Sequence, residues 1–224
     1  DSWLTVDGAT VALERHFARF AASADAQGLV RPVDDFLAAV RAAIPTTGQW
    51  FPRIELTVRG ELQVNLRQAP ERTDSVTLWS ASDDPRTEPA IKGPDIPALE
   101  ALREQARAAG ATEAVILDAE GFIVDGATTC LMWWRDGALT TPPTQFTRVD
   151  SVTVSVLHDI ARDQGVTLAI EAATPAALEG VEVWAVNALH GIRPVTAWVN
   201  GPTTAVDQNR VFDWRRVYND LRRS

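Results

Sequence analysis

The chain has 224 residues, and its hydrophobic fraction of 46% is enough to build a core in one large domain or two small ones. The formal net charge of −9 argues against nucleic acid as a partner, because binding to a phosphate backbone needs a basic surface. A single cysteine excludes an internal disulfide, the three histidines show no zinc-binding spacing, and no apolar run could span a bilayer, so we expect a cytoplasmic protein without a metal site or a membrane partner.

The first 80 residues alternate short strands with two helices. Residues 2–6 and 10–11 predict two strands. Apolar residues at helical spacing predict an amphipathic helix over 13–26, on which His16 and Arg19 share a face. On an ordinary helix such a pair is a solvated polar stripe. Further elements are predicted as a helix over 33–43 and as strands over 49–58, 62–66 and 76–80, with Pro52 at an edge or bulge of its strand.

A polar segment with two prolines, SDDPRTEP over 82–89, is the best linker candidate in the chain. We place the domain boundary there. The predicted organisation is an N-terminal α/β domain over 1–82, an interdomain linker over 83–91 and a C-terminal α/β, barrel-like domain over 92–224.

Lys92 follows this linker and is the only lysine, so the other twenty of the 21 basic residues are arginines. Arginine does not lose its proton in proteins, whereas a lysine amine can become neutral and form a Schiff base with an aldehyde. The simpler interpretation is a surface lysine left in an arginine-rich coding background. A third possibility is a Schiff-base enzyme that uses Lys92 without any cofactor.

A hairpin follows Lys92 after one helix. The helix is predicted to begin near Pro97 and to end at Gly110. Apolar strands over 114–117 and 122–124 flank a turn, and the segment 125–129 (DGATT) ends the second strand with a carboxylate, a glycine and two hydroxyls. This composition is typical of a polar site at the edge of a strand.

The last third contains a second candidate anion site. A helix is predicted to begin after Asp150-Ser151 and to run to about residue 164. Its amino terminus, with Ser151 and Thr153, offers free N–H groups to a phosphate, although ordinary capping explains the same residues. Later elements are predicted as a strand over 166–170, a short helix over 174–180, a buried strand over 181–186, a loop over 187–195, a strand ending at an Asn200-Gly201 turn, and a helix over 207–223.

Three stretches of this sequence resemble the class IV aminotransferases, the fold type IV pyridoxal-phosphate enzymes. They read LERHFARF, AVILDAEGFIVDGATT and NALHGIRPV. That group includes branched-chain and D-amino acid aminotransferases and 4-amino-4-deoxychorismate lyase. The resemblance implies a two-domain α/β (α+β) fold like that of D-amino acid aminotransferase, a homodimer, and one or two further strands before the first residue of this chain.

The resemblance also implies roles for individual residues. Lys92 would form the Schiff base with pyridoxal 5'-phosphate and then move protons as general acid and base. Arg19 would bind the cofactor phosphate, and Asp125 would pair with the pyridine nitrogen. The other implied cofactor contacts are Thr128, Thr129, Val152, Thr153, Ala188 and Leu189, and the implied substrate contacts are His190 and Arg193.

Three positions depart from the family pattern. Asp125 stands where the family usually has Glu, which is one methylene longer. Cys130 replaces an asparagine, and as a strand residue it is expected to be a small buried hydrophobe. Val154 replaces the arginine of the motif G-I-T-R. These departures leave open a degenerate member that binds the cofactor without turnover.

The resemblance implies pyridoxal-phosphate chemistry on an amino acid or related amine, but several reactions share such a site. Transamination is the first interpretation. Elimination of pyruvate from aminodeoxychorismate, which gives 4-aminobenzoate, is the alternative, and racemase-like reactions use the same cofactor site. The stretch NALHGIRPV is closer to the lyase and D-amino acid aminotransferase members than to the branched-chain ones.

Overall fold

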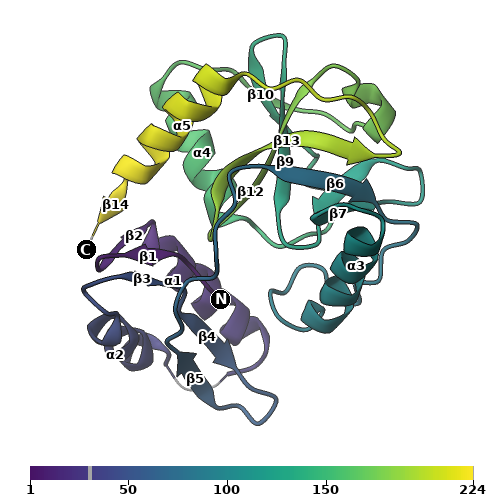
Figure 1. Ribbon diagram of the computed structural model, residues 1–224. Coiled ribbons are helices and arrows are strands. Elements are labelled where there is room, and N and C mark those ends of the chain that lie inside the picture. Colours follow the sequence, from purple (N-terminus) through teal and green to yellow (C-terminus); the bar gives the residue numbers. More distant parts are fainter. Residues whose placement is uncertain (30–31, 224) are drawn as a thin grey trace. The chain divides into compact units, whose positions relative to one another are not determined.

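The computed structural model describes residues 1–29 and 32–223, which divide into two compact units (Figure 1). One unit comprises Asp1–Arg72 together with the chain's last residues from Tyr218, and the other is Thr73–Val217. In the described residues, no helix combines the length and the apolar character needed to cross a membrane.

The described residues of the first unit form the helices α1 and α2, a small antiparallel sheet and a separate hairpin. The sheet has the order β14-β2-β1-β3, and the hairpin pairs β4 with β5. Buried side chains from α1, α2 and β4, among them Phe17, Val40 and Ile54, form the core with Trp3. The elements are α1 (Leu13–Ala26), α2 (Asp34–Ala43), β1 (Thr5–Val6), β2 (Ala9–Val11), β3 (Gln49–Trp50), β4 (Arg53–Leu56), β5 (Leu62–Asn65) and β14 (Arg222–Arg223).

The predicted helix over 13–26 is confirmed at both ends. The strand predicted over 49–58 is instead two short strands, β3 and β4, with Pro52 in the gap between them. A proline has no N–H to donate to a ladder, and this explains why the strand is interrupted there.

The second unit is built on one curled, mixed sheet of eight strands. Their order is β11-β10-β9-β12-β13-β6-β7-β8, and β6 runs parallel to both of its neighbours. The strands are β6 (Val76–Ser80), β7 (Glu113–Leu117), β8 (Ile123–Gly126), β9 (Cys130–Arg135), β10 (Ala138–Thr141), β11 (Leu168–Ile170), β12 (Glu182–Asn187) and β13 (Gly191–Val199). The helices are α3 (Ile96–Ala108), α4 (Val152–Asp163), the short 3₁₀ helix η1 (Pro175–Leu178) and α5 (Gln208–Asp220), whose last three residues fall in the first unit.

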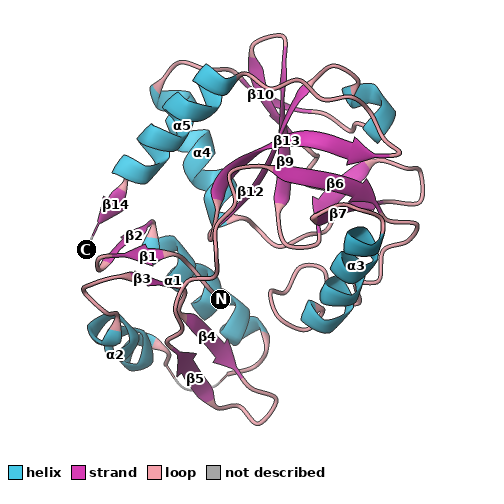
Figure 2. Cartoon of the chain, in the orientation of Figure 1, coloured by secondary structure: helices cyan, strands magenta, loops and turns pink. Residues whose placement is uncertain are grey.

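Strand alternation gives this sheet two different apolar faces. Val115 of β7 packs in one cluster with Leu78, Ile123 and Trp133, while its neighbour Ile116 packs in a second cluster with residues of α3. Because successive strand residues point to opposite faces, α3 covers one face of β6 and β7 (Figure 2). On the same sheet β8 pairs with β7 and β9 pairs with β12, and the ends of β8, β9 and β12 position the candidate site.

The division of the structure differs from the expected one at residues 83–91. Strand β6 pairs with β7 and β13 in the large sheet, so it falls in the second unit, and the chain divides between Arg72 and Thr73. Most of the stretch predicted as a loop over 187–195 is also strand, because Gly191–Val199 forms β13 along β12. Pro194 lies inside this strand, opposite Trp184.

Candidate functional site

Asp125 is a buried carboxylate near the carboxyl end of β8. The residue is 9% exposed, and its Oδ1 has no hydrogen-bond partner among the described residues. Burial raises the pKa of Asp125 to about 6, although the Cys130 thiol and the positive charges of Arg86 and Arg148 act in the opposite direction. A buried, incompletely satisfied carboxylate is costly unless something completes its contacts, which is typical of a binding site.

The turn after Asp125 is held tightly by its glycine. The Gly126 N–H donates to the Thr129 carbonyl at 2.8 Å, and a Cβ at position 126 would lie 2.3 Å from Thr129 Oγ1. Thr129 is buried, while the exposed Thr128 donates its hydroxyl to Glu113 of β7. The carboxylate–glycine–hydroxyl segment is therefore a rigid turn anchored on the neighbouring strand.

Cys130 connects this turn to the amino terminus of α4. Its thiol makes hydrogen bonds with Asp125 and Ser151, and burial together with the Asp125 charge raises the pKa of the thiol well above its usual value. The thiol therefore stays protonated and can donate. Ser151 caps α4 by accepting the Val154 N–H at 3.2 Å, so Val152 and Thr153 occupy the first turn, where backbone N–H groups precede the intrahelical bonds.

Asn187 ties the next predicted segment to the same turn. Its Nδ2 donates to the Thr128 carbonyl at 3.1 Å, and its Oδ1 accepts the N–H groups of Leu189 at 3.1 Å and His190 at 2.8 Å. The Leu189 amide, predicted as a cofactor contact, is thus engaged within its own turn. Ala188 lies half-buried beside it.

Lys92 lies in the segment between β6 and α3, and its side chain is exposed. The segment reaches Asp125 through Arg86, whose side chain is 6% exposed, forms an ion pair with Asp84 at 2.8 Å and places its charge near Asp125. Four segments of the second unit therefore meet around Asp125: the lysine segment, the 125–129 turn, the start of α4 and the 187–190 turn.

The two predicted substrate contacts have structural partners in this unit. Arg193 is 6% exposed, its Nη1 donates to Thr73 Oγ1 at 3.1 Å, and burial lowers its pKa. His190 Nδ1 accepts the Thr73 N–H at 3.2 Å. Arg193 also lies near the buried Glu113, whose pKa is raised by burial. A substrate role for either residue stays a prediction.

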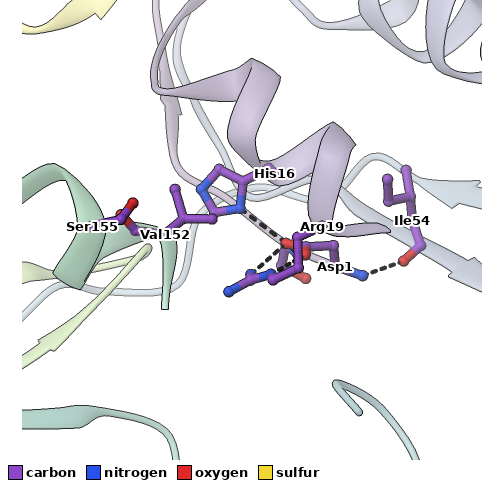
Figure 3. A network of polar contacts seen from close by, with 7 residues as sticks. Asp1, His16, Arg19, Ile54, Val152 and Ser155 are labelled. Atoms are coloured by element: carbon purple, nitrogen blue, oxygen red, sulfur yellow. Dashed lines mark hydrogen bonds and ion pairs between the residues drawn. The ribbon is translucent and has the colours of Figure 1, made fainter. Parts of the chain in front are cut away.

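Arg19 belongs to the first unit, whereas the segments that meet around Asp125 belong to the second. Its Nε and Nη2 donate to the two carboxylate oxygens of Asp1 at 2.8 and 3.0 Å, and His16 Nδ1 lies 3.0 Å from Asp1 Oδ1 (Figure 3). His16 is buried rather than part of a solvated stripe. Asp1 therefore holds two of the five guanidinium N–H groups in a fixed fork, and phosphate binding by Arg19 stays a prediction.

Several polar residues of the site were not singled out from the sequence. Arg86 and Arg148 had no local signature, because arginines are distributed along the whole chain. Glu113 had a usable signal, since it is a carboxylate that directly precedes an apolar strand. Thr129, Val152 and Thr153 were predicted as contacts and are all buried in the structure.

The fold and the site define a class of α/β proteins in which a curled sheet and a helix amino terminus surround a buried carboxylate. Solved structures with this fold include a Legionella pneumophila protein provisionally assigned as a 4-amino-4-deoxychorismate lyase, at 18% identity and a TM-score of 0.85, covering 99% of this chain and 90% of that chain. A branched-chain amino acid aminotransferase from Escherichia coli gives 19% identity and 0.80, covering 99% and 83%. An aminotransferase from Brucella abortus, bound to the cofactor PLP, gives 18% and 0.82, covering 98% and 87%.

The family itself follows from the sequence model of the amino-transferase class IV family, which matches residues 1–198. This chain belongs to that family. No curated protein sequence matches it.

Proposed function

We propose that this chain is a pyridoxal 5'-phosphate-dependent enzyme that transaminates an amino acid or a related amine. The observation that carries the proposal is the buried Asp125, whose Oδ1 lacks a partner in the described part of the chain and which lies beside the start of α4. A protonated ring nitrogen would supply the missing contact, and the helix amino terminus suits a phosphate. Membership in the family and the cofactor bound to the Brucella abortus aminotransferase support the same assignment.

The residues of the second unit fit such a cofactor in three ways. Asp125 would hold the ring nitrogen, and the ion pair would favour its ionised form over the neutral form that burial alone favours. The first-turn amides of α4 at Val152 and Thr153 would hold the phosphate. Lys92, an exposed residue, would hold the aldehyde carbon through Nζ.

When bound, the cofactor supplies an electron sink for the bonds at the substrate Cα. The protein contributes position and proton transfer. The Lys92 amine moves the proton at the substrate Cα as general base and then as general acid. Asp125 keeps a proton on the ring nitrogen, which strengthens the sink.

A lyase that eliminates pyruvate from aminodeoxychorismate is the second candidate. The similarity to the Legionella pneumophila protein favours it, together with the stretch NALHGIRPV. A cofactor-binding member without turnover is the third, motivated by the residues at positions 125, 130 and 154. We also propose a homodimer in the cytoplasm, on the basis of the family alone.

The test is the absorption spectrum of the purified protein with added pyridoxal 5'-phosphate. We expect a near-visible band in the wild type that is lost in Lys92→Ala and in Lys92→Arg, which keeps the positive charge without a reactive amine. Bleaching of the band by an amino donor would support transamination. A lysine-dependent band that no amino acid bleaches would favour the lyase, to be tried next with aminodeoxychorismate. Absence of any lysine-dependent band would refute the proposed function.

A further inference from the structure

Asp95, three residues after Lys92, closes the lysine segment into a ring. One carboxylate oxygen accepts both the backbone N–H and the hydroxyl of Thr87 at 2.9 Å, and the other accepts the N–H of Glu88 at 2.9 Å. Asp95 is 7% exposed. Burial alone would raise the pKa of Asp95, but these donors outweigh it and hold the pKa below its usual value.

Helix capping does not explain this carboxylate. Asp95 occupies the N-cap position of α3, where an aspartate normally accepts the N–H of the second or third helical residue. Within the described residues its side chain makes no capping hydrogen bond to α3. The side chain points back along the chain and accepts hydrogen bonds from Thr87 and Glu88 instead. These contacts, which close the ring, replace the usual helix-capping contact.

Lys92 lies inside this ring, between two turns. The Ile91 N–H donates to the Glu88 carbonyl at 2.9 Å, and the Ile96 N–H donates to the Gly93 carbonyl at 3.1 Å. The stretch contains neither helix nor strand before α3 begins. The conformation of this stretch therefore depends on its turn and side-chain hydrogen bonds. These contacts must offset the conformational entropy lost on ordering, about 1–2 kcal/mol for each backbone residue.

Arg86 anchors the amino-terminal end of the same segment near Asp125. Arg86 directly precedes Thr87 and donates from Nε and Nη2 to Asp84 at 2.9 and 2.8 Å. Its charge acts on both Asp95 and Asp125. Through Arg86, the segment closed by Asp95 thus connects Lys92 to Asp125, the buried carboxylate that would face the pyridine ring of the cofactor.

We propose that Asp95 is a positioning residue, whose contacts to Thr87 and Glu88 hold the Lys92 amine in place for its reaction. This inference rests on the proposed function of Lys92. It predicts a graded series, because Asp95→Ala removes all three contacts, while Asp95→Asn can keep the oxygen that faces Thr87 but presents an NH₂ to the Glu88 N–H. Asp118→Ala is the matched control, since Asp118 also accepts two backbone N–H groups in a turn of this unit, at 3.1 Å from Glu120 and 2.8 Å from Phe122.

The experiment uses the full chain and two readouts. The first is the rate at which the Lys92-dependent band forms with pyridoxal 5'-phosphate. We expect Asp95→Ala to slow it about tenfold or more and Asp95→Asn about threefold, because a displaced reacting group can lose up to about 10²-fold in rate. Asp118→Ala should stay within about twofold of the wild type by the same reasoning.

The second readout needs no cofactor. Reductive methylation with ¹³C-formaldehyde labels the α-amino group and one lysine side chain, because the chain contains one lysine, and the NMR signal of that lysine can be followed against pH. We expect the Lys92 signal and its titration to change in Asp95→Ala, to change less in Asp95→Asn, and to be the same in Asp118→Ala and the wild type.

The outcomes separate the two hypotheses. If the wild type forms no lysine-dependent band, the proposed function fails. If the wild type forms the band and both Asp95 variants match it in rate and in the Lys92 titration, the positioning role is overturned while the proposed function stands. If Asp95→Ala does not fold, Asp95→Asn against Asp118→Ala decides the question in the same way.

Discussion

Two buried aspartates of the second unit, Asp95 and Asp125, have nearly the same exposed fraction, 7% and 9%. Their pKa values are nevertheless shifted in opposite directions. Asp95 receives three hydrogen bonds from its own chain segment, and its pKa is lowered. Asp125 keeps one oxygen without a partner in the described residues, and its pKa is raised to about 6. The two carboxylates differ in how many donors meet the charged form and in how strongly burial penalises that form, since burial is the largest influence on Asp125.

This difference indicates different roles for the two carboxylates. A satisfied buried carboxylate stabilises the fold, and its removal leaves donors without acceptors. An unsatisfied one costs stability unless a ligand completes it. Asp95 is therefore part of the framework of the site, whereas Asp125 is the group that the framework presents. The two residues should respond to the same substitution with opposite changes in stability.

The largest expected effect is the loss of activity in Asp125→Asn. An amide cannot keep a proton on a ring nitrogen, and the loss of one partner of a buried ion pair costs about 3–5 kcal/mol, so we expect the half-reaction with an amino donor to slow by about 10²- to 10³-fold. The measurement is the rate at which the near-visible band bleaches in the stopped flow.

Stability provides the control for this variant. Asp125→Asn should leave the cofactor-free protein at least as stable as the wild type near neutral pH, whereas Asp95→Asn should destabilise it. Half-reaction rates equal to the wild type in Asp125→Asn would exclude the pairing of Asp125 with the cofactor ring. Asp125→Glu, with the side chain that is usual in the family, tests whether the shorter carboxylate limits the rate.

The next effect is a pH-dependent loss of stability in the cofactor-free protein. The pKa of Asp125 rises from 3.8 to about 6 on folding, so the folded state keeps a proton that the unfolded state releases, and stability falls as pH rises from about 4 to about 6. Above that window the cost is about 3 kcal/mol relative to Asp125→Asn, at about 1.36 kcal/mol for each pKa unit. Urea unfolding of both proteins from pH 4 to 7 measures the difference.

Asp95 supplies the opposite case for the same experiment. Its lowered pKa means that it stabilises the fold at pH values above the usual aspartate pKa, and that this contribution disappears as pH falls through the lowered pKa. The difference between wild type and Asp95→Asn should therefore shrink toward acid pH. If the wild type and Asp125→Asn had parallel stability profiles, the raised pKa of Asp125 would be refuted.

Local patterns predicted the fold well, because helices and buried strands carry periodic signals. The helix over 13–26 and the cap at Ser151 follow from spacing and residue type, and both are confirmed. The position of β6 could not be predicted in this way. It depends on pairing with β13, more than 110 residues later, and no local signal in 76–80 specifies that partner.

Two residues of the candidate site stand out in the sequence, and their roles stay predictions. Lys92 is unique in composition, and Asp125 begins a carboxylate–glycine–hydroxyl segment. The residues that hold these two in place, Asp95, Arg86 and Cys130, act through contacts that depend on how loops fold back. Asp95 even occupies a helix N-cap position, so its sequence context predicts a different hydrogen bond from the one it makes.

The smallest expected effect concerns Cys130, whose thiol makes a hydrogen bond with Asp125. Cys130→Ala removes the thiol, so the pKa of Asp125 should rise further and the pH window of its stability loss should move upward. Cys130→Ser keeps a donor and should not move the window upward. Because a thiol is a weak donor, we expect about 0.5–1 kcal/mol, or a two- to fivefold change in half-reaction rate. The same urea series measures the change in this pH window. Identical windows for Cys130→Ala, Cys130→Ser and the wild type would show that the Cys130 thiol does not contribute to the pKa of Asp125.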